Sequence, residues 1–399
     1  MVKKTALLLS ILILGCSACQ VLATAPRLTP LPLPTAAASP HPVTLSTQAA
    51  IGATPTSPPT ATPFPLASAT PTATPPEALV RLVNPLTGLE VSDPRLLTQR
   101  PILVKLANWP ESLRPFVGIN GADMVFEYYI GHQMNHLAAL YYGRDEAPVG
   151  PLAPARDFDL KLMETYQSHL VIASAPDALD HVLRRDLWPR TAIRGDLPYP
   201  AFYTEPLAMG GNTVVDTAAV RAGLNERYSY RFVPGLQGMV FDPIPPKGGQ
   251  TAIELCYTYA DFSVMQWHFD ALSTRYELWQ DLKKADGKYT VVPSRDREGD
   301  PVAFDNLVVL FGKYVEYSDK DYDFELPQAS PQQALVLRDG QLYYARWQVP
   351  GPLSPIVLTD QNDQPLALKP GRTWMVFSSI NTRTERDAEG IWDLYFSVK

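Results

Sequence analysis

Residues 121–142 read GADMVFEYYIGHQMNHLAALYY, and this stretch decides which fold we expect. Two apolar, aromatic-rich runs, Met124–Tyr129 and Leu137–Tyr142, are separated by the polar segment Gly131–Asn135. Short runs of this composition, bounded by turn residues, are typical of β-strands. The stretch therefore predicts two strands that pair with each other across a turn.

The residues around this pair indicate further strands and helices. Strands are expected at Ile102–Ala107 and His169–Ala173 because both runs are short and apolar. Helices are expected at Phe158–Gln167, from the N-cap Ser174 to about Leu187, and at Thr217–Arg227. The sequence thus predicts a mixed α/β N-terminal domain over residues 79–240.

After about residue 240 the pattern changes to alternating, aromatic-rich runs. The strands expected there are Thr251–Tyr259, Val264–Phe269, Tyr276–Gln280, Leu307–Tyr317, Ala334–Leu337, Leu342–Val349 and Thr373–Phe377. Arg338-Asp339-Gly340 contains the Asp-Gly pair of a tight hairpin turn. We therefore predict a mainly antiparallel β C-terminal domain over residues 241–399, and an α+β fold class for the whole chain.

Residues 1–19 have the pattern of a bacterial lipoprotein signal peptide. Lys3 and Lys4 precede the apolar run Ala6–Leu14, which is too short to span a bilayer. The run ends in Ile-Leu-Gly before Cys16, which resembles the lipobox that precedes a lipid-modified cysteine. We favour Cys16 as the lipid anchor, carrying acyl chains such as palmitate. Cys19 is the alternative, because a Ser-Ala pair precedes it.

Residues 20–78 form a linker rich in Pro, Thr, Ala and Ser. Fourteen of the 40 prolines lie between Pro26 and Pro76, where Arg27 is the only strong base and no residue is acidic. Proline removes backbone donors and keeps the chain extended, so this composition cannot build a core. We expect a disordered stalk that holds the folded part away from a membrane.

Five short motifs follow one another along residues 82–378. They are residues 84–89 (NPLTGL), 121–127 (GADMVFE), 149–151 (VGP), 155–156 (AR) and 370–374 (PGRTW). Their order and spacing resemble the YerB-like bacterial lipoproteins, a two-segment family of unknown function. The resemblance implies a lipid-anchored protein whose two segments meet near the change in composition, and it implies no particular chemistry.

The chain departs from that family's pattern at two places. The pattern's Gly-Gly-x-Thr-Arg turn falls in the stretch Gly131–His136, which has no arginine. The pattern's Gly-Pro-x-Arg-Ser-Ala-Arg becomes Gly150–Arg156, in which only the second arginine remains. An anion site built on the two missing arginines in relatives is therefore not expected here in the same form.

Several polar residues are candidates for one ligand-binding cleft. They are Glu127, His132, His136, Arg156 and Asp157, with His169 beside them. Glu127 ends a predicted strand, the first two histidines follow in the turn, and Arg156 opens a predicted helix. A helix N-terminus with an arginine is a typical anion site. Alternatively, Arg156 pairs with Glu127 or Asp157 and only braces the loops.

Other kinds of site lack support in the sequence. His132 and His136 have HxxxH spacing but lie in a predicted turn, so we expect no metal site. Neither a catalytic motif nor a nucleotide-binding glycine pattern is present, so we assign no catalytic residue and no cofactor. The net charge of −7 opposes nucleic-acid binding. The 7 tryptophans and 19 tyrosines are more typical of a β-rich core than of a sugar-binding surface.

Three functional hypotheses follow. The leading one is a non-catalytic binding or interaction module, anchored at the outer face of the bacterial cytoplasmic membrane. Its partner would be a cell-wall polymer, a small anion or another envelope protein. The alternative is an envelope hydrolase acting on cell-wall or extracellular polymer, with Glu127 and Asp157 as an acid/base pair facing one open cleft. The third is an anion-sensing or solute-binding component with Arg156 exposed in a concave site.

Overall fold

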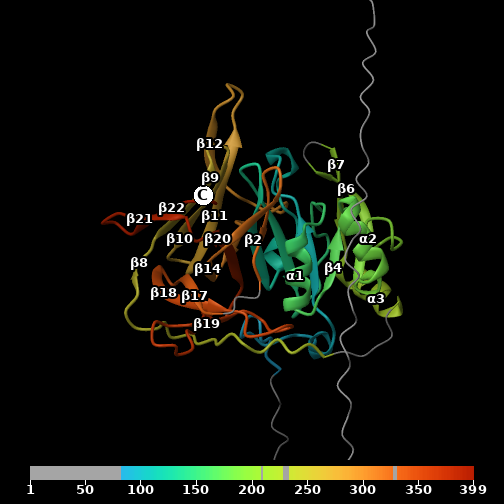
Figure 1. Cartoon of the computed structure of the whole chain (residues 1–399), viewed down its shortest axis with the longest axis horizontal. Helices are drawn as coiled ribbons and strands as arrows, with labels where there is room; N and C mark the ends of the chain where they lie inside the picture. Colours follow the sequence, from blue (N-terminus) through green and yellow to red (C-terminus); the bar gives the residue numbers. More distant parts are fainter. Residues whose placement is uncertain (1–81, 208–209, 228–232, 327–329) are drawn as a thin grey trace, which may run out of the picture. The chain divides into compact units, whose positions relative to one another are not determined.

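The structure is a computed structural model that describes residues 82–207, 210–227, 233–326 and 330–399 (Figure 1). The described residues all belong to one compact unit. The expected signal peptide, the anchor candidates Cys16 and Cys19, and the expected stalk lie outside the described residues. Within the described ranges, no helix combines the length and the hydropathy needed to cross a membrane.

The described strands form two sheets and a separate hairpin (Figure 1). The large sheet has thirteen strands, with the main order β19-β18-β17-β14-β20-β2-β3-β1-β4-β5, and β8, β15 and β16 joined at its sides. Its strands are β1 (Ile102–Leu106), β2 (Met124–Gly131), β3 (Met134–Tyr141), β4 (His169–Ile172), β5 (Thr191–Ile193), β8 (Gln250–Thr251), β14 (Asn306–Gly312), β15 (Tyr314–Ser318), β16 (Asp321–Phe324), β17 (Gln332–Arg338), β18 (Gln341–Gln348), β19 (Val357–Thr359) and β20 (Thr373–Ser379).

The second sheet has seven strands, with the main order β12-β11-β10-β9-β22-β21 and β13 paired to β11. Its strands are β9 (Glu254–Ala260), β10 (Ser263–Asp270), β11 (Arg275–Lys283), β12 (Tyr289–Pro293), β13 (Ala303–Phe304), β21 (Arg383–Arg386) and β22 (Ile391–Tyr395). The separate hairpin consists of β6 (Phe202–Leu207) and β7 (Gly210–Val215). The helices are α1 (Asp157–Thr165), α2 (Asp177–Arg185) and α3 (Thr217–Arg227), with short 3₁₀ turns at Pro94–Thr98, Glu111–Leu113, Ile119–Gly121 and Trp188–Arg190.

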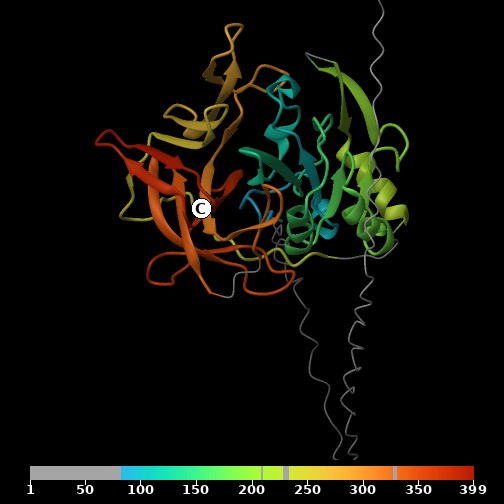
Figure 2. The same ribbon diagram turned by 45° about the horizontal axis from the view of Figure 1, so that its top comes forward.

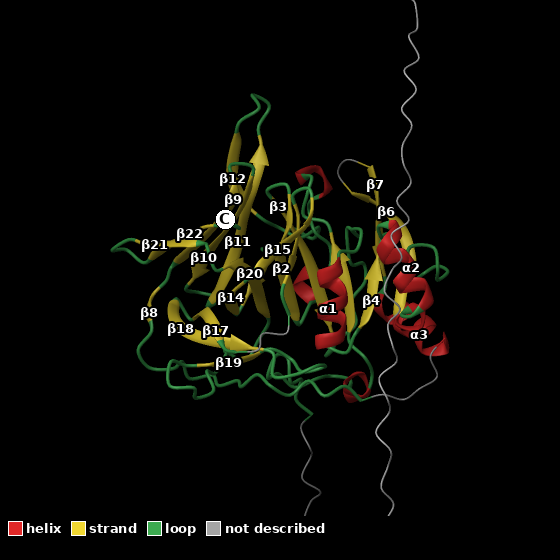
Figure 3. Cartoon of the chain, viewed as in Figure 1, coloured by secondary structure: helices red, strands yellow, loops and turns green. Residues whose placement is uncertain are grey.

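The predicted α+β fold class is confirmed. All three α-helices follow β3 in the N-terminal part, and the strands after residue 240 pair mainly antiparallel (Figure 3). The predicted pair at residues 121–142 forms as β2 and β3, which join antiparallel with Glu127 opposite Leu137. Aromatic and aliphatic side chains favour buried strands, and all eight residues of β2 are buried.

Strands from both sides of residue 240 are interleaved in the large sheet. β20, from the C-terminal segment, lies between β2 and β14 and runs parallel to both. In register, Trp374 of β20 stands between Val125 and Leu307. The boundary expected at residues 240–241 therefore separates two stretches of sequence that share one sheet.

Both faces of the large sheet around β2 are covered. On one face α1 supplies Phe158, whose ring lies 4.8 Å from Tyr128 of β2 and 4.7 Å from Phe377 of β20. On the other face the second sheet supplies Trp267, whose ring lies 4.9 Å from Trp374. This double cover explains why polar residues of β2 are as buried as their apolar neighbours.

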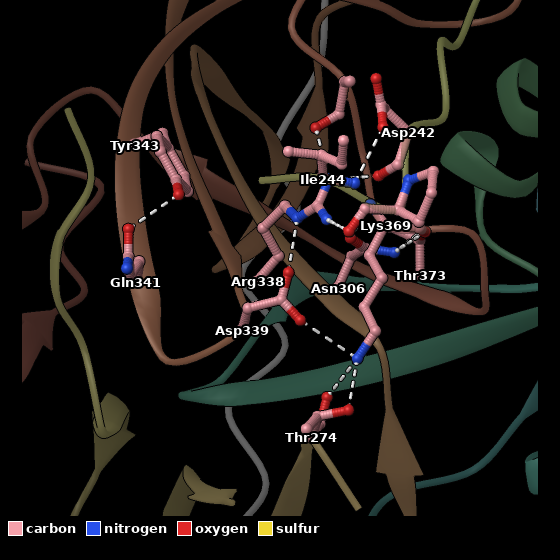
Figure 4. A network of polar contacts seen from close by, with 12 residues as sticks. Asp242, Ile244, Thr274, Asn306, Arg338, Asp339, Gln341, Tyr343, Lys369 and Thr373 are labelled. Atoms are coloured by element: carbon pink, nitrogen blue, oxygen red, sulfur yellow. Dashed lines mark hydrogen bonds and ion pairs between the residues drawn. The ribbon is translucent and has the colours of Figure 1, made fainter. Parts of the chain in front are cut away.

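A buried arginine ties the segment that follows residue 240 to the hairpin β17–β18 (Figure 4). The guanidinium of Arg338 donates hydrogen bonds to the carbonyls of Asp242 at 2.8 Å, Pro243 at 3.2 Å and Ala367 at 3.3 Å. It also pairs with Asp339 at 2.9 Å. Asp339 adopts a positive φ of 53° in the predicted tight turn, a conformation that aspartate tolerates.

Two local predictions were wrong. Helix α2 begins at Asp177 with Pro176 as its N-cap and no side-chain cap, whereas Ser174 was expected there. The carbonyl of Ser174 instead accepts a hydrogen bond from the Ala155 amide at 2.8 Å, which holds the chain extended before the helix. The run expected as one strand at Leu307–Tyr317 is divided into β14 and β15, because β15 turns away to pair with β16.

Candidate functional site

The structure does not bring the five predicted cleft residues together. Tyr128 faces α1, since its hydroxyl contacts the Asp159 carboxyl there. Successive side chains of a strand point to opposite faces, so Glu127 faces the second sheet. Arg156 and Asp157, at the start of α1, therefore lie on the other side of the large sheet from Glu127.

Glu127 is fully buried between the two sheets. Its Oε1 accepts a hydrogen bond from Asn135 Nδ2 at 2.7 Å, and its Oε2 accepts one from Trp374 Nε1 at 2.7 Å. Burial raises the pKa of this carboxyl to about 7, and the two hydrogen bonds oppose the rise. With 0% of its surface exposed, Glu127 has no contact with solvent or with a ligand in this conformation.

A chain of amides continues from Glu127 into the second sheet. Asn108 Nδ2 donates to Asn135 Oδ1 at 2.8 Å, and Gln280 Nε2 donates to Asn108 Oδ1 at 2.8 Å. Ser294 Oγ then donates to Gln280 Oε1 at 3.0 Å. Every donor in the chain points toward Glu127, so the bonds polarise one another in the same direction. This arrangement fits a role for Glu127 in joining the two sheets.

The opposite face holds a buried ion pair that the sequence did not reveal as a site. Lys105 Nζ lies 3.3 Å from Asp159 Oδ1, and both side chains are 0% exposed. The Tyr128 hydroxyl contacts both partners. Burial lowers the pKa of Lys105 to about 8, against the attraction of Asp159. The only signal in the sequence is a single lysine within the apolar run 102–106.

His136 and Arg156 lie on this same face. His136 is 8% exposed, and burial, together with the charges of Lys105 and Arg156, holds its pKa well below the usual value. The Arg156 amide donates to Asp159 Oδ2 at 2.7 Å. Among the described residues, the Arg156 guanidinium makes no ion pair, and its buried Nε has no hydrogen-bond partner. Arg156 therefore pairs with neither Glu127 nor Asp157, and the alternative considered above was wrong.

The remaining candidates lie apart from one another. His132 is half exposed in the β2–β3 turn, with Nε2 3.7 Å from Asp321 Oδ1. Asp157 lies at the surface, and the partial loss of water around its carboxyl, together with the charge of the nearby Asp323, raises its pKa. His169 is 2% exposed in β4, and burial lowers its pKa to about 3, so it is a neutral core residue. In the described ranges, no group of three or more potential ligands is placed to hold a metal ion.

The turn between β2 and β3 carries an unusual backbone. His132 and Gln133 have positive φ values of 51° and 62°, as the type I′ form of a two-residue hairpin turn requires at both central positions. Glycine adopts this conformation without steric cost, and the family pattern described above has a Gly-Gly pair in this turn. Here the same turn is made by two residues with side chains.

A groove of about 980 Å³ lies elsewhere, between the β17–β18 strands and the β21–β22 hairpin. Figure 2 shows the β21–β22 hairpin, in red, beside the orange strands of the large sheet. Two contacts join its sides: Arg386 donates to Gln250 Oε1 at 3.0 Å, and the rings of Tyr344 and Trp392 lie 6.3 Å apart. No local pattern in the sequence indicates this groove, because its walls come from separate strands of the chain.

Besides the groove itself, its polar character was not predicted from the sequence. Four glutamines line it, at positions 250, 332, 333 and 361. Tyr344 is 51% exposed there, although most tyrosines of the described chain are buried, as expected for a β-rich core. The groove is thus the place where amide and aromatic side chains meet at the surface.

These features define an α+β protein in which two chain segments share one sheet around a buried polar centre. Residues 86–229 match the N-terminal domain, and residues 254–375 the C-terminal domain, of the family described as protein of unknown function (DUF3048). The chain belongs to this family, and the resemblance to YerB-like proteins is confirmed.

Two similar proteins support this assignment. One is "Putative lipoprotein YerB" of Bacillus subtilis (strain 168), which is 24% identical over 324 residues, or 79% of this chain and 90% of that protein. The other is the crystal structure of YerB protein from Bacillus subtilis, with a TM-score of 0.60 at 20% identity. It covers 74% of this chain and 96% of that chain, and at this identity it shows the fold.

Proposed function

We propose that this protein is a lipid-anchored, non-catalytic binding module of the bacterial envelope, which holds an envelope polymer in the groove between β17–β18 and β21–β22. The groove carries the proposal. Its volume of about 980 Å³ is at the upper end of the range of ligand sites. Two other hollows of the described chain, beside Arg114 and beside Tyr199, are smaller, at about 350 and 510 Å³. Its exposed amides and aromatic ring are suited to binding.

The burial of Glu127 speaks against the hydrolase alternative. A glycoside hydrolase needs two carboxyl groups about 5–9.5 Å apart on either side of the scissile bond. Glu127 is enclosed between the sheets, and Asp157 lies on the opposite face of the large sheet. The pair proposed for acid/base chemistry therefore has no common cleft, which supports binding without catalysis.

The anchor belongs to the same proposal. The lipobox-like sequence before Cys16, with Cys19 as the alternative, supports acylation at the outer face of the cytoplasmic membrane. The name of the B. subtilis relative also refers to a lipoprotein. Metabolic labelling with an alkyne fatty acid tests this. We expect the Cys16→Ala variant to lose the label and Cys19→Ala to keep it. Label retained in both single variants and in the double variant would exclude an anchor at either cysteine.

Polymer binding is tested with the full-length protein in detergent micelles and insoluble cell walls that have kept their attached polymers. We expect the protein to sediment with the walls, and the bound fraction to saturate as protein is added. Protein that remains in the supernatant at every wall concentration would contradict the proposal. Release of reducing ends or peptides from the walls by the wild-type protein would contradict its non-catalytic part.

A further inference from the structure

We infer that the groove binds a glycan chain, through the exposed side chains of Tyr344 and Ile380 and through the glutamine amides of the lining. This inference rests on the proposed function, because it names the ligand class of the same groove. It follows from three properties of the lining: its charge balance, its hydrogen-bonding groups and its exposed apolar surface.

The charges that line the groove are few and balanced in sign. Glu385 forms an ion pair with Arg383 on the same strand. Arg386 donates to Gln250 Oε1 at 3.0 Å and lies 5.3 Å from the centre of the Trp392 ring. One carboxylate and one guanidinium among the lining residues leave no excess of either sign. The single guanidinium of the lining is held by the Gln250 amide and the Trp392 ring, and the near-neutral lining favours an uncharged polar ligand over an anion.

The hydrogen-bonding groups of the lining are mainly neutral. Gln332 uses its Nε2 on the Ser330 carbonyl at 3.0 Å, which leaves its Oε1 to accept a further bond. In the described part of the chain, the side chains of Gln333 and Gln361 have no hydrogen-bond partner, and both residues are exposed. A carboxamide offers donors and an acceptor at its two ends. It can therefore bind two neighbouring hydroxyl groups, or a hydroxyl and an acetamido group, of one sugar.

The apolar side chains of the lining are exposed to solvent, so a ligand that covers them would bury apolar surface. Tyr344 is 51% exposed and Ile380 is 58% exposed. The Tyr344 ring is held from the side by Trp392, whose indole Nε1 donates to the Thr251 carbonyl at 3.0 Å. A sugar ring has an apolar face of C–H groups and an edge of hydroxyls. An aromatic ring packs against the apolar face of the sugar, and the surrounding amides hydrogen-bond to its hydroxyl groups.

The test uses the full-length protein in micelles and two soluble probes made from the same cell walls. One probe is glycan strands from which stem peptides and anionic polymers have been removed, and the other is the released stem peptides. Binding is measured by tryptophan fluorescence and by calorimetry. The Tyr344→Ala variant is compared with Tyr317→Ala, a matched control because Tyr317 is 49% exposed on β15 outside the groove.

We expect the glycan strands to bind the wild-type protein and the Tyr317→Ala variant equally. The Tyr344→Ala variant should bind about tenfold more weakly, because the loss of one aromatic contact and its buried area is of the order of 1.4 kcal/mol. Gln333→Ala should weaken binding by a smaller factor. Thermal unfolding of each variant, followed by circular dichroism, verifies that the fold is retained.

Three results would overturn the inference. Retention of the protein on intact walls without binding to glycan strands would refute the glycan assignment and leave the proposed function standing. Binding of stem peptides alone would give the groove a peptide ligand. Equal glycan binding by the Tyr344→Ala and Tyr317→Ala variants would place the glycan site outside the groove. Failure to bind either intact walls or glycan strands would reject the proposed function as well.

Discussion

Glu127 shows how one carboxyl can link stability to pH. Burial raises its pKa in the folded state from 4.5 to about 7. A raised pKa means that the folded protein holds this proton more tightly than the unfolded chain. The associated stability is present below the unfolded pKa and is lost as the pH rises through the folded pKa. Stability should therefore fall between about pH 4.5 and pH 7, by on the order of 3 kcal/mol for this group.

The Glu127→Gln variant tests that linkage. We expect the free energy of unfolding, measured with urea at pH 5 and pH 8, to change less with pH than in the wild-type protein. Part of the change should remain, because burial also raises the pKa of Asp123 to about 6. At pH 5 the variant should be less stable, because one of the two N–H donors that meet Glu127 would face an amide NH₂ group. An unchanged pH profile would show that Glu127 does not titrate as described.

Lys105 and Asp159 make a second residue-scale prediction. Removing one partner of a buried pair leaves the other charge without compensation, at a cost of about 3–5 kcal/mol. We expect Lys105→Met to lower the free energy of urea unfolding by that amount. The double variant Lys105→Met/Asp159→Asn should regain at least half of the loss, since asparagine still accepts the Arg156 amide hydrogen bond. A double variant no more stable than the single one would show that the pair is not the cause.

At the scale of elements, composition predicted several of the strands and helices whose residues are buried. The apolar runs at β1, β2, β4 and β20 formed strands, and the helix expected at Thr217–Arg227 has those bounds in the structure. The strand β21 was not predicted, because all four of its residues are exposed and polar. Its strand conformation comes from pairing with β22, and a local pattern carries no information about such a partner.

The segment after residue 240 is the element for which Arg338 makes a testable contribution. Arg338→Ala would remove the donor of three partly buried hydrogen bonds, so we expect a loss of about 3 kcal/mol and faster proteolysis near Asp242 and Pro243. Arg346→Ala on the neighbouring strand is the matched control. Its ion pair with Asp363 is exposed, and its loss should cost less than about 1 kcal/mol. Similar losses in both variants would mean that the Arg338 contacts do not hold this segment.

At the scale of the whole molecule, the sequence predicted the fold class but neither the shared sheet nor the site. β20 pairs with β2, although Val125 and Trp374 are 249 positions apart in the chain. Local periodicity does not encode such a pairing. The candidate cleft was not formed for a related reason. The strand containing Glu127 was predicted correctly. Which of its faces is covered by α1 and which by the second sheet depends on long-range packing, and no local sequence pattern predicts that packing.

The shared sheet leads to the last prediction. If residues 79–240 and 241–399 were independent domains, each would unfold cooperatively alone. The structure instead places β20 between β2 and β14, so separation would expose the backbone edges of β2 and β20 and the ring of Trp374. Exposed strand edges and apolar surface favour aggregation over folding. We therefore expect neither segment alone to show a cooperative thermal transition. When the two are co-expressed, they should assemble into one complex that unfolds in a single step, as followed by size-exclusion chromatography and calorimetry. A cooperative transition in either isolated segment would show that the shared sheet is not required for its folding.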